Sequence, residues 1–540
     1  MLEQIGHSPA LQRLLSAKPK SALIKKVKEF SPNYNHIAKI HYKAFATDGV
    51  SLDIQNFRLF FEQNNMKVFC CSGDVPAREE ATGRGKRFDN LSYQSARVKN
   101  LTDRVFAKNV NPETKETDQE KILQEILDIS LELENDLETY VNYQGIGVLD
   151  IRNIFSLPYN LPATLALYRL LLRRKDLLFL LHHHDFVWEW EARIKKFTSE
   201  YKLINELVSL MFPPYLDQPN YQHVVLSSIA EAQLRKRGIE NIFVSPDSFD
   251  FSKLTPLKDP EKGKQYLKDM KKDLWKSLGI GDNDIVLGCM TRITPRKRIE
   301  LTIQLIHEMQ KIKKSEETRQ KLESAGGKLK INNGEMTAES QFVLLLCQDE
   351  DLDHNQDYYQ TLQSYAQKLG VKLVLAGKKL AQSSDFSSEE EKIYYFLDAY
   401  FLINGMGYPS EQEGFGNQFL EGVWAGHVTP IVRYPVFEAD IKQHIHYFID
   451  QGEPRSLRPL KDKDLPVDLE LFEMPPELTQ AAAREWFKLM LDPDKYQELA
   501  AENLAKIRSQ FDTKVVGQRF LTNLDDMRRQ FLLSRLREYV

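Results

Sequence analysis

The feature that most constrains the fold is the alternation of short apolar runs, rich in β-branched residues, with longer stretches of helical periodicity. This order is typical of parallel sheets covered by helices. A first series of expected strands comprises Ile37–Tyr42, Lys67–Cys71, Gly147–Ile154, Leu177–His182, His223–Leu226 and Ile242–Val244. A second comprises Ile285–Met290, Phe342–Cys347, Val371–Ala376, Tyr400–Asn404 and Val428–Val432. Two such series in 540 residues predict an α/β protein with two doubly wound domains that face a cleft.

The polar stretch Ser252–Lys276 interrupts the pattern and is a plausible connection between the domains. Two further polar segments fit the scheme poorly: Ala77–Asn90, which we expect to be a mobile loop, and Lys311–Gln341, a charged insertion on the surface. After Pro475 the pattern becomes helical. We therefore expect an N-terminal helical extension, two Rossmann-like domains, and C-terminal helices that cross back to the first domain, at residues 1–35, 36–255, 256–480 and 481–540.

Composition excludes several classes of protein. The chain holds 73 Lys and Arg against 77 Asp and Glu, so no excess of positive charge indicates a nucleic-acid partner. Four cysteines without metal-binding spacing indicate reduced thiols in a cytoplasmic protein. The first residues lack the apolar centre of a signal peptide, and no apolar run approaches the ~20 residues that cross a bilayer, so we expect no transmembrane segment.

The segment Tyr408–Tyr434 carries most of the chemical information. An expected strand end leads into the glycine-containing turn Gly414–Phe415–Gly416, and a helix is expected to start near Asn417. Backbone N–H groups at such a helix N-terminus form a natural anion site. Glu413 in the loop and Glu421 two turns into the helix would both reach a ligand that lies along the helix.

A second segment, Cys289–Glu300, places Arg292 at the end of an expected strand and Lys297 five residues later, at an expected helix start. A planar guanidinium and a compact ammonium group at this edge suit a diphosphate leaving group, because they stabilise the negative charge that develops on it.

Together these residues resemble a known family. The pattern E-G-F-G-x-x-x-L-E, preceded by R-x-x-x-x-K, is similar to the donor site of the retaining GT-B glycosyltransferases of family four, over roughly Ile37 to Ile441. Within that family, several stretches resemble the mannosylglucosylglycerate synthase branch; they are Thr47–Phe57, Asn153–Pro162, His182–Trp190, the segment around Arg292, the segment around Glu413, and Arg433–Ile441.

The resemblance implies a role for each matched residue. Gly49 lets backbone approach the donor phosphates, Arg292 and Lys297 bind the diphosphate, Glu413 holds sugar hydroxyls, Glu421 takes the ribose, and Gly414, Phe415, Gly416 and Asn417 complete the donor site. Asn153 matches the position of a histidine in many relatives; with His184 and Asp185 it is expected to face the acceptor. Thr291, Arg298 and Gly422 depart from the usual glycine, glycine and alanine, without loss of a required charge.

Two groups of polar residues have a competing metal-site interpretation. In His182–Asp185 adjacent side chains of a strand point to opposite faces, so at most alternate histidines converge. The acidic residues Asp349, Glu350, Asp351 and Asp353 follow a strand into a polar loop, which favours solvated side chains. We therefore expect no metal and no cofactor. Phe186, Trp188 and Trp190 are expected either to line an acceptor-sugar subsite or to form a packed surface.

The resemblance implies that a hexose is transferred with retention from a nucleotide-diphosphate sugar to a small polar acceptor. The branch favours mannose, GDP-mannose as donor and a glucosylglycerate-type acceptor, with UDP- or ADP-glucose still open as donors. No glycosidase-like carboxylate pair is apparent, in keeping with such a transferase. Three alternatives remain: a phosphorylase of the same fold, a non-catalytic protein that binds sugar nucleotides, and a scaffold built around the insertion and terminal helices. The oligomeric state is left open.

Overall fold

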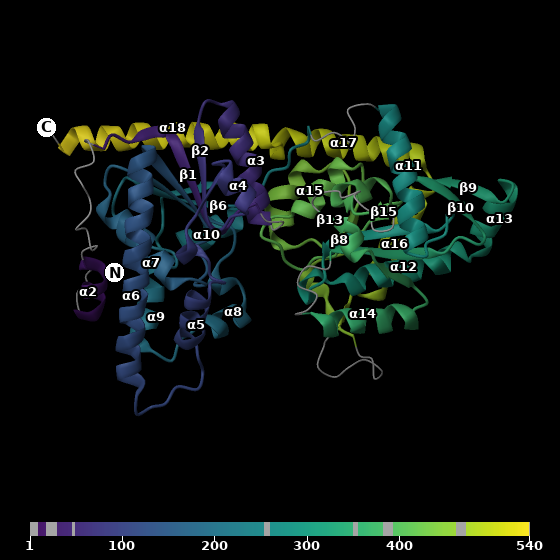
Figure 1. Cartoon of the computed structure of the whole chain (residues 1–540). Helices are drawn as coiled ribbons and strands as arrows, with labels where there is room; N and C mark the ends of the chain where they lie inside the picture. Colours follow the sequence, from purple (N-terminus) through teal and green to yellow (C-terminus); the bar gives the residue numbers. More distant parts are fainter. Residues whose placement is uncertain are drawn as a thin grey trace. The chain divides into compact units, whose positions relative to one another are not determined.

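The computed structural model describes residues 9–17, 30–45, 49–252, 260–348, 355–381, 392–460 and 471–538. The chain forms two compact units (Figure 1). Unit 1 combines Met1–Pro246 with Thr513–Val540, and unit 2 comprises Asp247–Asp512. The C-terminal segment expected at 481–540 is divided after Asp512. Its first part belongs to unit 2, and the part from Thr513 onward belongs to unit 1.

Unit 1 contains a seven-stranded sheet with the order β3-β2-β1-β4-β5-β6-β7, in which every neighbouring pair is parallel. Its strands are β1 (Asn33–Lys43), β2 (Lys67–Asp74), β3 (Gly85–Arg87), β4 (Ile146–Arg152), β5 (Leu178–His183), β6 (Tyr221–Val225) and β7 (Ile242–Val244). The six strands expected in the first half are confirmed, with boundaries moved by a few residues. The same edge of the sheet thus carries the carboxyl ends of all these strands.

The helices and short 3-10 helices of unit 1 are α2 (Pro9–Ser16), α3 (Gly49–Gln63), α4 (Ala77–Ala81), η1 (Asp89–Leu91), α5 (Ala96–Val105), α6 (Lys115–Gln144), α7 (Leu161–Arg173), η2 (Val187–Glu189), α8 (Glu191–Phe197), α9 (Lys202–Met211), α10 (Ser228–Arg235) and α18 (Thr513–Glu538). The start of α7 follows from its sequence: the Asn160 side chain accepts a hydrogen bond from the backbone N–H of Ala163, and Pro162 lies in the first turn.

Alternate residues of the strands divide the core of unit 1 between the two faces of the sheet. Ala38, Leu149 and Phe179 pack on the face covered by α6, α7 and α9. Ile37 and Val148 pack on the other face, with Phe57 and Phe61 of α3 and Phe520 of α18. Helix α18, drawn in yellow in Figure 1, contacts α3 and so completes this face of the sheet.

Unit 2 has a four-stranded parallel sheet with the order β12-β11-β8-β15, formed by β8 (Ile285–Arg292), β11 (Phe342–Gln348), β12 (Lys372–Leu375) and β15 (Gly405–Met406). A bridge between Tyr408 and Ile431 leads on to β16 (Pro430–Ile431) and β17 (Ile449–Asp450), which are also parallel to each other. The remaining strands form short pairs; they are β9 (Lys328–Ile331), β10 (Gly334–Thr337), β13 (Leu380–Ala381), β14 (Tyr394–Tyr395), β18 (Arg458–Pro459) and β19 (Phe472–Glu473).

The long helices of unit 2 are α11 (Pro260–Ser277), α12 (Ile299–Lys313), α13 (Glu316–Ser324), α14 (Gln356–Lys368), α15 (Asn417–Trp424), α16 (Pro476–Met490) and α17 (Pro493–Phe511). Short helical turns join them; they are η3 (Pro295–Lys297), η5 (Gly377–Lys379), η6 (Phe396–Phe401), η7 (Phe437–Ile441), η8 (Lys442–His444) and η9 (Pro454–Ser456). The core is built by α12, α14, α16 and α17 around the sheet, and Trp486 lies fully buried in it.

Three expectations about local structure were wrong. Tyr400–Asn404 is not a strand: η6 runs to Phe401, and the strand is only Gly405–Met406, because a short buried apolar run carries no periodicity that separates these states. Ala77–Asn90 is not an irregular loop but contains α4, the edge strand β3 and η1. Ser252–Lys276 is mostly helix α11 of unit 2; residues 253–259 lie outside the described part.

The insertion Lys311–Gln341, expected as a charged surface segment, contains α13 and the β9–β10 hairpin, and most of its residues are exposed or partly exposed. The hairpin turn is held by a reciprocal pair of buried amides, in which the Asn332 side chain donates to the Asn404 carbonyl oxygen and the Asn404 side chain donates to the Asn332 carbonyl oxygen, each at 2.9 Å. The hairpin is anchored to unit 2 by this pair and by Ile331 and Met336, which pack in the core. Among the described helices of the whole chain, none is both long and apolar enough to cross a membrane.

Candidate active site

The β8–α12 connection places two cations at the carboxyl end of the unit 2 sheet. Arg292 is the last residue of β8, and Lys297 ends the short helix η3, where its side chain is almost completely buried. The expected helix start at Lys297 is shifted, because Arg298 adopts a left-handed conformation and α12 begins at Ile299. The positive charge of Arg292 is one of the influences that lower the pKa of Lys297, so the two cations lie near each other.

Glu413 joins this connection to the loop before α15. Its carboxylate forms ion pairs with Lys297 and with Arg296, the second at 2.8 Å. The Arg296 guanidinium also donates to the Gln412 carbonyl oxygen at 2.9 Å. The structure thus pairs Lys297 with Glu413, and Arg292 lies near enough for its charge to act on Lys297. Arg296, which directly precedes Lys297, is not among the predicted site residues.

Burial and charge act in opposite directions in this ion pair. Burial lowers the pKa of Lys297 to about 8, with Glu413 acting against the shift. Burial alone would raise the pKa of Glu413, but the positive charges of Lys297 and Arg296 outweigh it and hold that pKa well below its usual range. Glu413 is therefore a carboxylate at any neutral pH and accepts hydrogen bonds only.

The turn at Gly414–Gly416 leads into α15 in a conformation that requires glycine. Gly416 has φ 146°, and a Cβ atom there would collide with the Tyr434 hydroxyl group. That hydroxyl donates to the Phe415 carbonyl oxygen at 2.7 Å, which fixes the turn. Gly414 is exposed, whereas Phe415 is buried. Helix α15 begins at Asn417, as predicted, so its first N–H groups lie beside the turn.

The two remaining residues that were predicted to bind the nucleotide-sugar donor lie on different elements. Glu421 lies on α15, where it accepts a hydrogen bond from the hydroxyl group of the buried Tyr400. Gly49 opens α3 of unit 1, after the carboxyl end of β1. The sequence contains no signal for the Tyr400 contact, because Tyr400 falls in an apolar run for which a strand was expected.

The predicted acceptor residues meet at the carboxyl ends of β4 and β5 in unit 1. Asn153 has φ 60°, and its side-chain oxygen accepts hydrogen bonds from the backbone N–H groups of His184 and Asp185, at 3.2 and 3.3 Å. The Asp185 carboxylate forms an ion pair with Arg193 at 3.2 Å. One side chain thus fixes the backbone that carries both of the other predicted residues.

The consecutive histidines point to alternate faces, as expected. The rings of His182 and His184 stack at 4.8 Å between centroids. His183 lies on the other face, hydrogen-bonded to Ser156 at 2.7 Å and to His223 at 2.9 Å. Burial lowers the pKa of His182 to about 4, so this ring is neutral at neutral pH. No group of three or more metal-ligating side chains gathers among the described residues, and residues 349–354, with the acidic run, lie outside them.

A buried ionic cluster lies beneath His182. Lys39 and Arg152 contact Asp150 at 2.7 and 2.9 Å, and Arg152 also forms an ion pair with Asp53. All four side chains are nearly inaccessible to solvent. Because two positive and two negative charges balance, no charge of this cluster is left uncompensated, and the ion pairs tie β1, β4 and α3 together.

Among the aromatic residues of the same loop, Phe186 and Trp188 are a packed surface. Their rings stack at 4.4 Å, and Trp188 donates to the Gln233 side chain at 2.7 Å and lies under the Arg237 guanidinium group. Trp190 is partly exposed and lies near Arg193.

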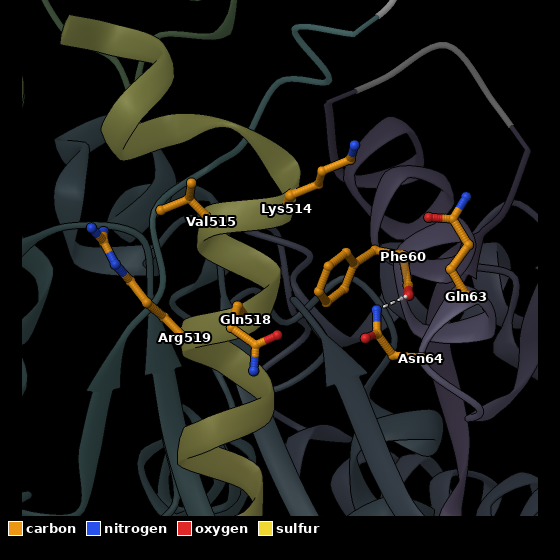
Figure 2. A pocket seen from close by; sticks show the side chains of 7 residues that line it. All are labelled: Phe60, Gln63, Asn64, Lys514, Val515, Gln518 and Arg519. Atoms are coloured by element: carbon orange, nitrogen blue, oxygen red, sulfur yellow. Dashed lines mark hydrogen bonds between the residues drawn. The ribbon is translucent and has the colours of Figure 1, made fainter.

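Unit 1 also contains a surface groove of about 710 Å³ between the end of α3 and the start of α18 (Figure 2). It is lined by Phe60, Gln63, Asn64, Lys514, Val515, Gln518 and Arg519. None of the predicted site residues lines this groove, so it is separate from both candidate sites.

Comparison with known proteins identifies relatives over most of the chain. No protein-family model matches the sequence. The mannosylglucosylglycerate synthase of Petrotoga mobilis is 30% identical over 406 residues, which are 75% of this chain and 84% of that protein. The enzyme of the same name from Thermotoga maritima is 27% identical over 472 residues, 86% of this chain and 94% of that one.

Solved structures agree on the fold. A glycosyltransferase from Rickettsia africae superimposes with a TM-score of 0.53 at 11% identity, over 92% of this chain and 99% of that one. The Anabaena protein HepE, crystallised with UDP and glucose, has a TM-score of 0.52 at 11% identity, over 91% and 99%. Together with the two parallel sheets and the convergence of Arg292, Lys297 and Glu413, these relationships show that the chain belongs to the mannosylglucosylglycerate synthase family of GT-B glycosyltransferases.

Proposed function

We propose that the protein transfers mannose from GDP-mannose to a small acceptor of the glucosylglycerate type, with retention of the anomeric configuration. The observation that carries the proposal is the convergence, in unit 2, of Arg292, Lys297 and Glu413 with the turn that starts α15. Two relatives named mannosylglucosylglycerate synthase support the choice of sugar and acceptor. In this proposal unit 2 binds the donor and unit 1 binds the acceptor.

The roles of the donor residues follow from their chemistry. Arg292, Lys297 and the first N–H groups of α15 hold the diphosphate, because fixed positive charge is worth most where negative charge develops. Glu413, kept ionised by Lys297 and Arg296, accepts hydrogen bonds from sugar hydroxyl groups. Glu421 accepts hydrogen bonds from the ribose, and Gly49 lets backbone approach the phosphates.

The proposed reaction is a displacement on one face of the sugar. The bond between the anomeric carbon and the β-phosphate oxygen breaks, and the acceptor hydroxyl oxygen forms the new bond to that carbon. The acceptor proton passes to the departing phosphate oxygen, so a nucleoside diphosphate leaves. The side chains around the anomeric carbon position the two substrates and exclude water. Asn153, His184 and Asp185 orient the acceptor.

The test combines a product analysis with two substitutions. The purified protein is incubated with GDP-mannose and glucosylglycerate, and the anomeric configuration of the product is read by NMR. Arg292→Ala and Lys297→Ala are expected to lower turnover by ~100-fold or more, because each removes a hydrogen-bonding cation that stabilises the transition state. Lys311→Ala, which removes a surface lysine paired with Glu308, is the matched control and should keep full activity.

Two results would contradict the proposal. Near-normal turnover of either site variant would show that the two cations do not serve the leaving group. Phosphate-dependent release of a sugar 1-phosphate from a disaccharide, without transfer from GDP-mannose, would identify a phosphorylase instead. A thermal-shift comparison of GDP, UDP and ADP decides the base, since a ligand at 100 times its dissociation constant adds about 2.7 kcal/mol of stability.

A further inference from the structure

The side chain of Tyr400 reaches from η6 to the carboxylate of Glu421 on α15. Its hydroxyl group donates to Oε2 of Glu421, and the tyrosine is completely buried. Glu421 as a residue is only partly buried. A fully buried tyrosine therefore holds the carboxylate of a residue that is itself partly exposed.

The backbone of Tyr400 is held by the turn that follows α15. Nε2 of His427 lies 2.7 Å from the Tyr400 carbonyl oxygen. A carbonyl oxygen only accepts, so this nitrogen carries the proton. Burial lowers the pKa of His427 to about 4, which keeps the ring neutral. Glu421 on α15 and His427 in the turn after it therefore hold Tyr400 through its side chain and its backbone, respectively.

The hydroxyl group of Tyr400 remains a donor over the whole working range of pH. Burial, followed by the negative charge of Glu421, raises its pKa well above the ordinary value for tyrosine. A hydrogen bond to a carboxylate is worth roughly twice one between neutral groups. The contact therefore restricts Glu421 to the arrangement in which Oε2 faces Tyr400.

We propose that Tyr400 is a positioning residue that orients Glu421 to accept hydrogen bonds from the 2′- and 3′-hydroxyl groups of the donor ribose. This inference rests on the proposed function, in which Glu421 binds the ribose. A carboxylate offers about four acceptor positions, so it serves Tyr400 and a diol at the same time. An oriented carboxylate binds more tightly, because the cost of ordering the side chain is already met in the free protein.

The experiment measures how strongly the protein distinguishes a ribose from a sugar that lacks the diol. Isothermal titration uses GDP, UDP and ADP, and then the 2′,3′-dideoxy form of whichever nucleotide binds. Tyr400→Phe is expected to weaken binding of the ribonucleotide about tenfold and to leave the dideoxy nucleotide unchanged. A merely structural role of the hydroxyl group would weaken both nucleotides equally, so the ratio of the two affinities is the decisive readout.

Tyr394→Phe is the matched control, because the Tyr394 hydroxyl group also donates to a carboxylate of unit 2, that of Asp273, at 2.7 Å. This variant should keep the wild-type ratio. Glu421→Asp provides a second route if Tyr400→Phe does not fold, since the shorter carboxylate no longer reaches Tyr400; its ratio should also fall. Where both variants fold, the double variant should lose no more than Glu421→Asp alone.

The outcomes separate the two proposals. If none of the three nucleotides binds, the proposed function fails, and this inference fails with it. If a nucleotide binds but Tyr400→Phe or Glu421→Asp keeps the wild-type ratio, the role of Tyr400 is overturned while the donor site stands. If Tyr394→Phe lowers the ratio as much as Tyr400→Phe does, the effect is a general one of unit 2, and the inference is likewise overturned.

Discussion

Lys297 is a buried cation whose charge depends on pH within the range of ordinary assays. Its pKa is lowered to about 8 by burial, so the free protein loses this charge above that pH. Binding of a diphosphate then requires uptake of a proton. Affinity for the nucleoside diphosphate should therefore fall as pH rises above about 8, by up to about tenfold for each pH unit.

Lys297→Arg supplies the control for this pH dependence. A guanidinium group stays charged throughout the range, so the variant should bind with an affinity that changes little between pH 7.5 and 10, whatever its absolute value. Titration calorimetry at several pH values measures both proteins. A flat profile for the wild-type protein would show that the charge of Lys297 does not contribute to diphosphate binding.

Substitution of Asn153 should affect binding of the acceptor separately from binding of the donor. Asn153→Ala removes two hydrogen bonds to the backbone of His184 and Asp185 at a left-handed position. We expect the KM for the acceptor to rise about tenfold, as loss of one or two hydrogen bonds does, with the donor affinity unchanged. Two-substrate steady-state kinetics give both quantities.

Asn333→Ala, in unit 2, is the matched control for Asn153→Ala. Asn333 is also left-handed, with φ 56°, and its side chain donates to the Ile403 carbonyl oxygen at 2.9 Å. Both variants should lose a similar amount of stability, but only Asn153→Ala should change the acceptor KM. An equal change in the two variants would assign the effect to general destabilisation.

The turn before α15 and the start of that helix were predictable because their signals are local in the sequence. A glycine turn before a helix has a direct sequence signal, and Gly416 occupies a conformation that only glycine adopts readily. The contacts of Tyr400 with Glu421 and of Arg296 with Glu413 join residues that are 21 and 117 positions apart. Contacts over such distances depend on tertiary packing, which a single sequence does not encode in its periodicity.

The same reasoning explains the errors in secondary structure. The long apolar strands of unit 1 were recognisable because both faces of their sheet are buried. The edge strand β3 has only three residues, and β15 has two, so neither leaves a pattern. The insertion was predicted from its polar composition, yet its hairpin is held by Asn332 and Asn404, a pair that the sequence does not connect.

Glycines with positive φ angles lie before and after α15, and substituting each of them tests the role of the Gly414–Gly416 turn. Gly416→Ala adds a Cβ atom that collides with the Tyr434 hydroxyl group, at a φ angle unsuited to alanine. We expect nucleotide affinity to fall about tenfold or more, in line with backbone strain of ~1–3 kcal/mol at the turn. Gly426→Ala, at φ 84° with open space around it, should cost about 1 kcal/mol of stability and leave affinity unchanged. Unaltered binding by Gly416→Ala would exclude the turn from the donor site.

At the scale of the whole molecule, each unit has its own core, so unfolding should occur in two steps. Phe520→Ala removes a buried ring of α18 that contacts Phe57 and Phe61, at a cost of ~3–5 kcal/mol to unit 1. Trp486→Ala should do the same to unit 2. In calorimetry each variant should lower a different transition, and nucleotide should raise the transition of unit 2 more than that of unit 1. A single transition that both variants lower equally would contradict independent cores.

The division of unit 1 into two stretches of sequence has a consequence for how the protein is made. During translation the sheet of unit 1 is synthesised long before Thr513–Val540, and all of unit 2 is synthesised in between. Until α18 leaves the ribosome, the sheet face that carries Ile37 and Val148 lacks one of its covers. The nascent chain therefore completes its second lobe first, and it must keep an unfinished apolar surface from aggregating until α18 has emerged.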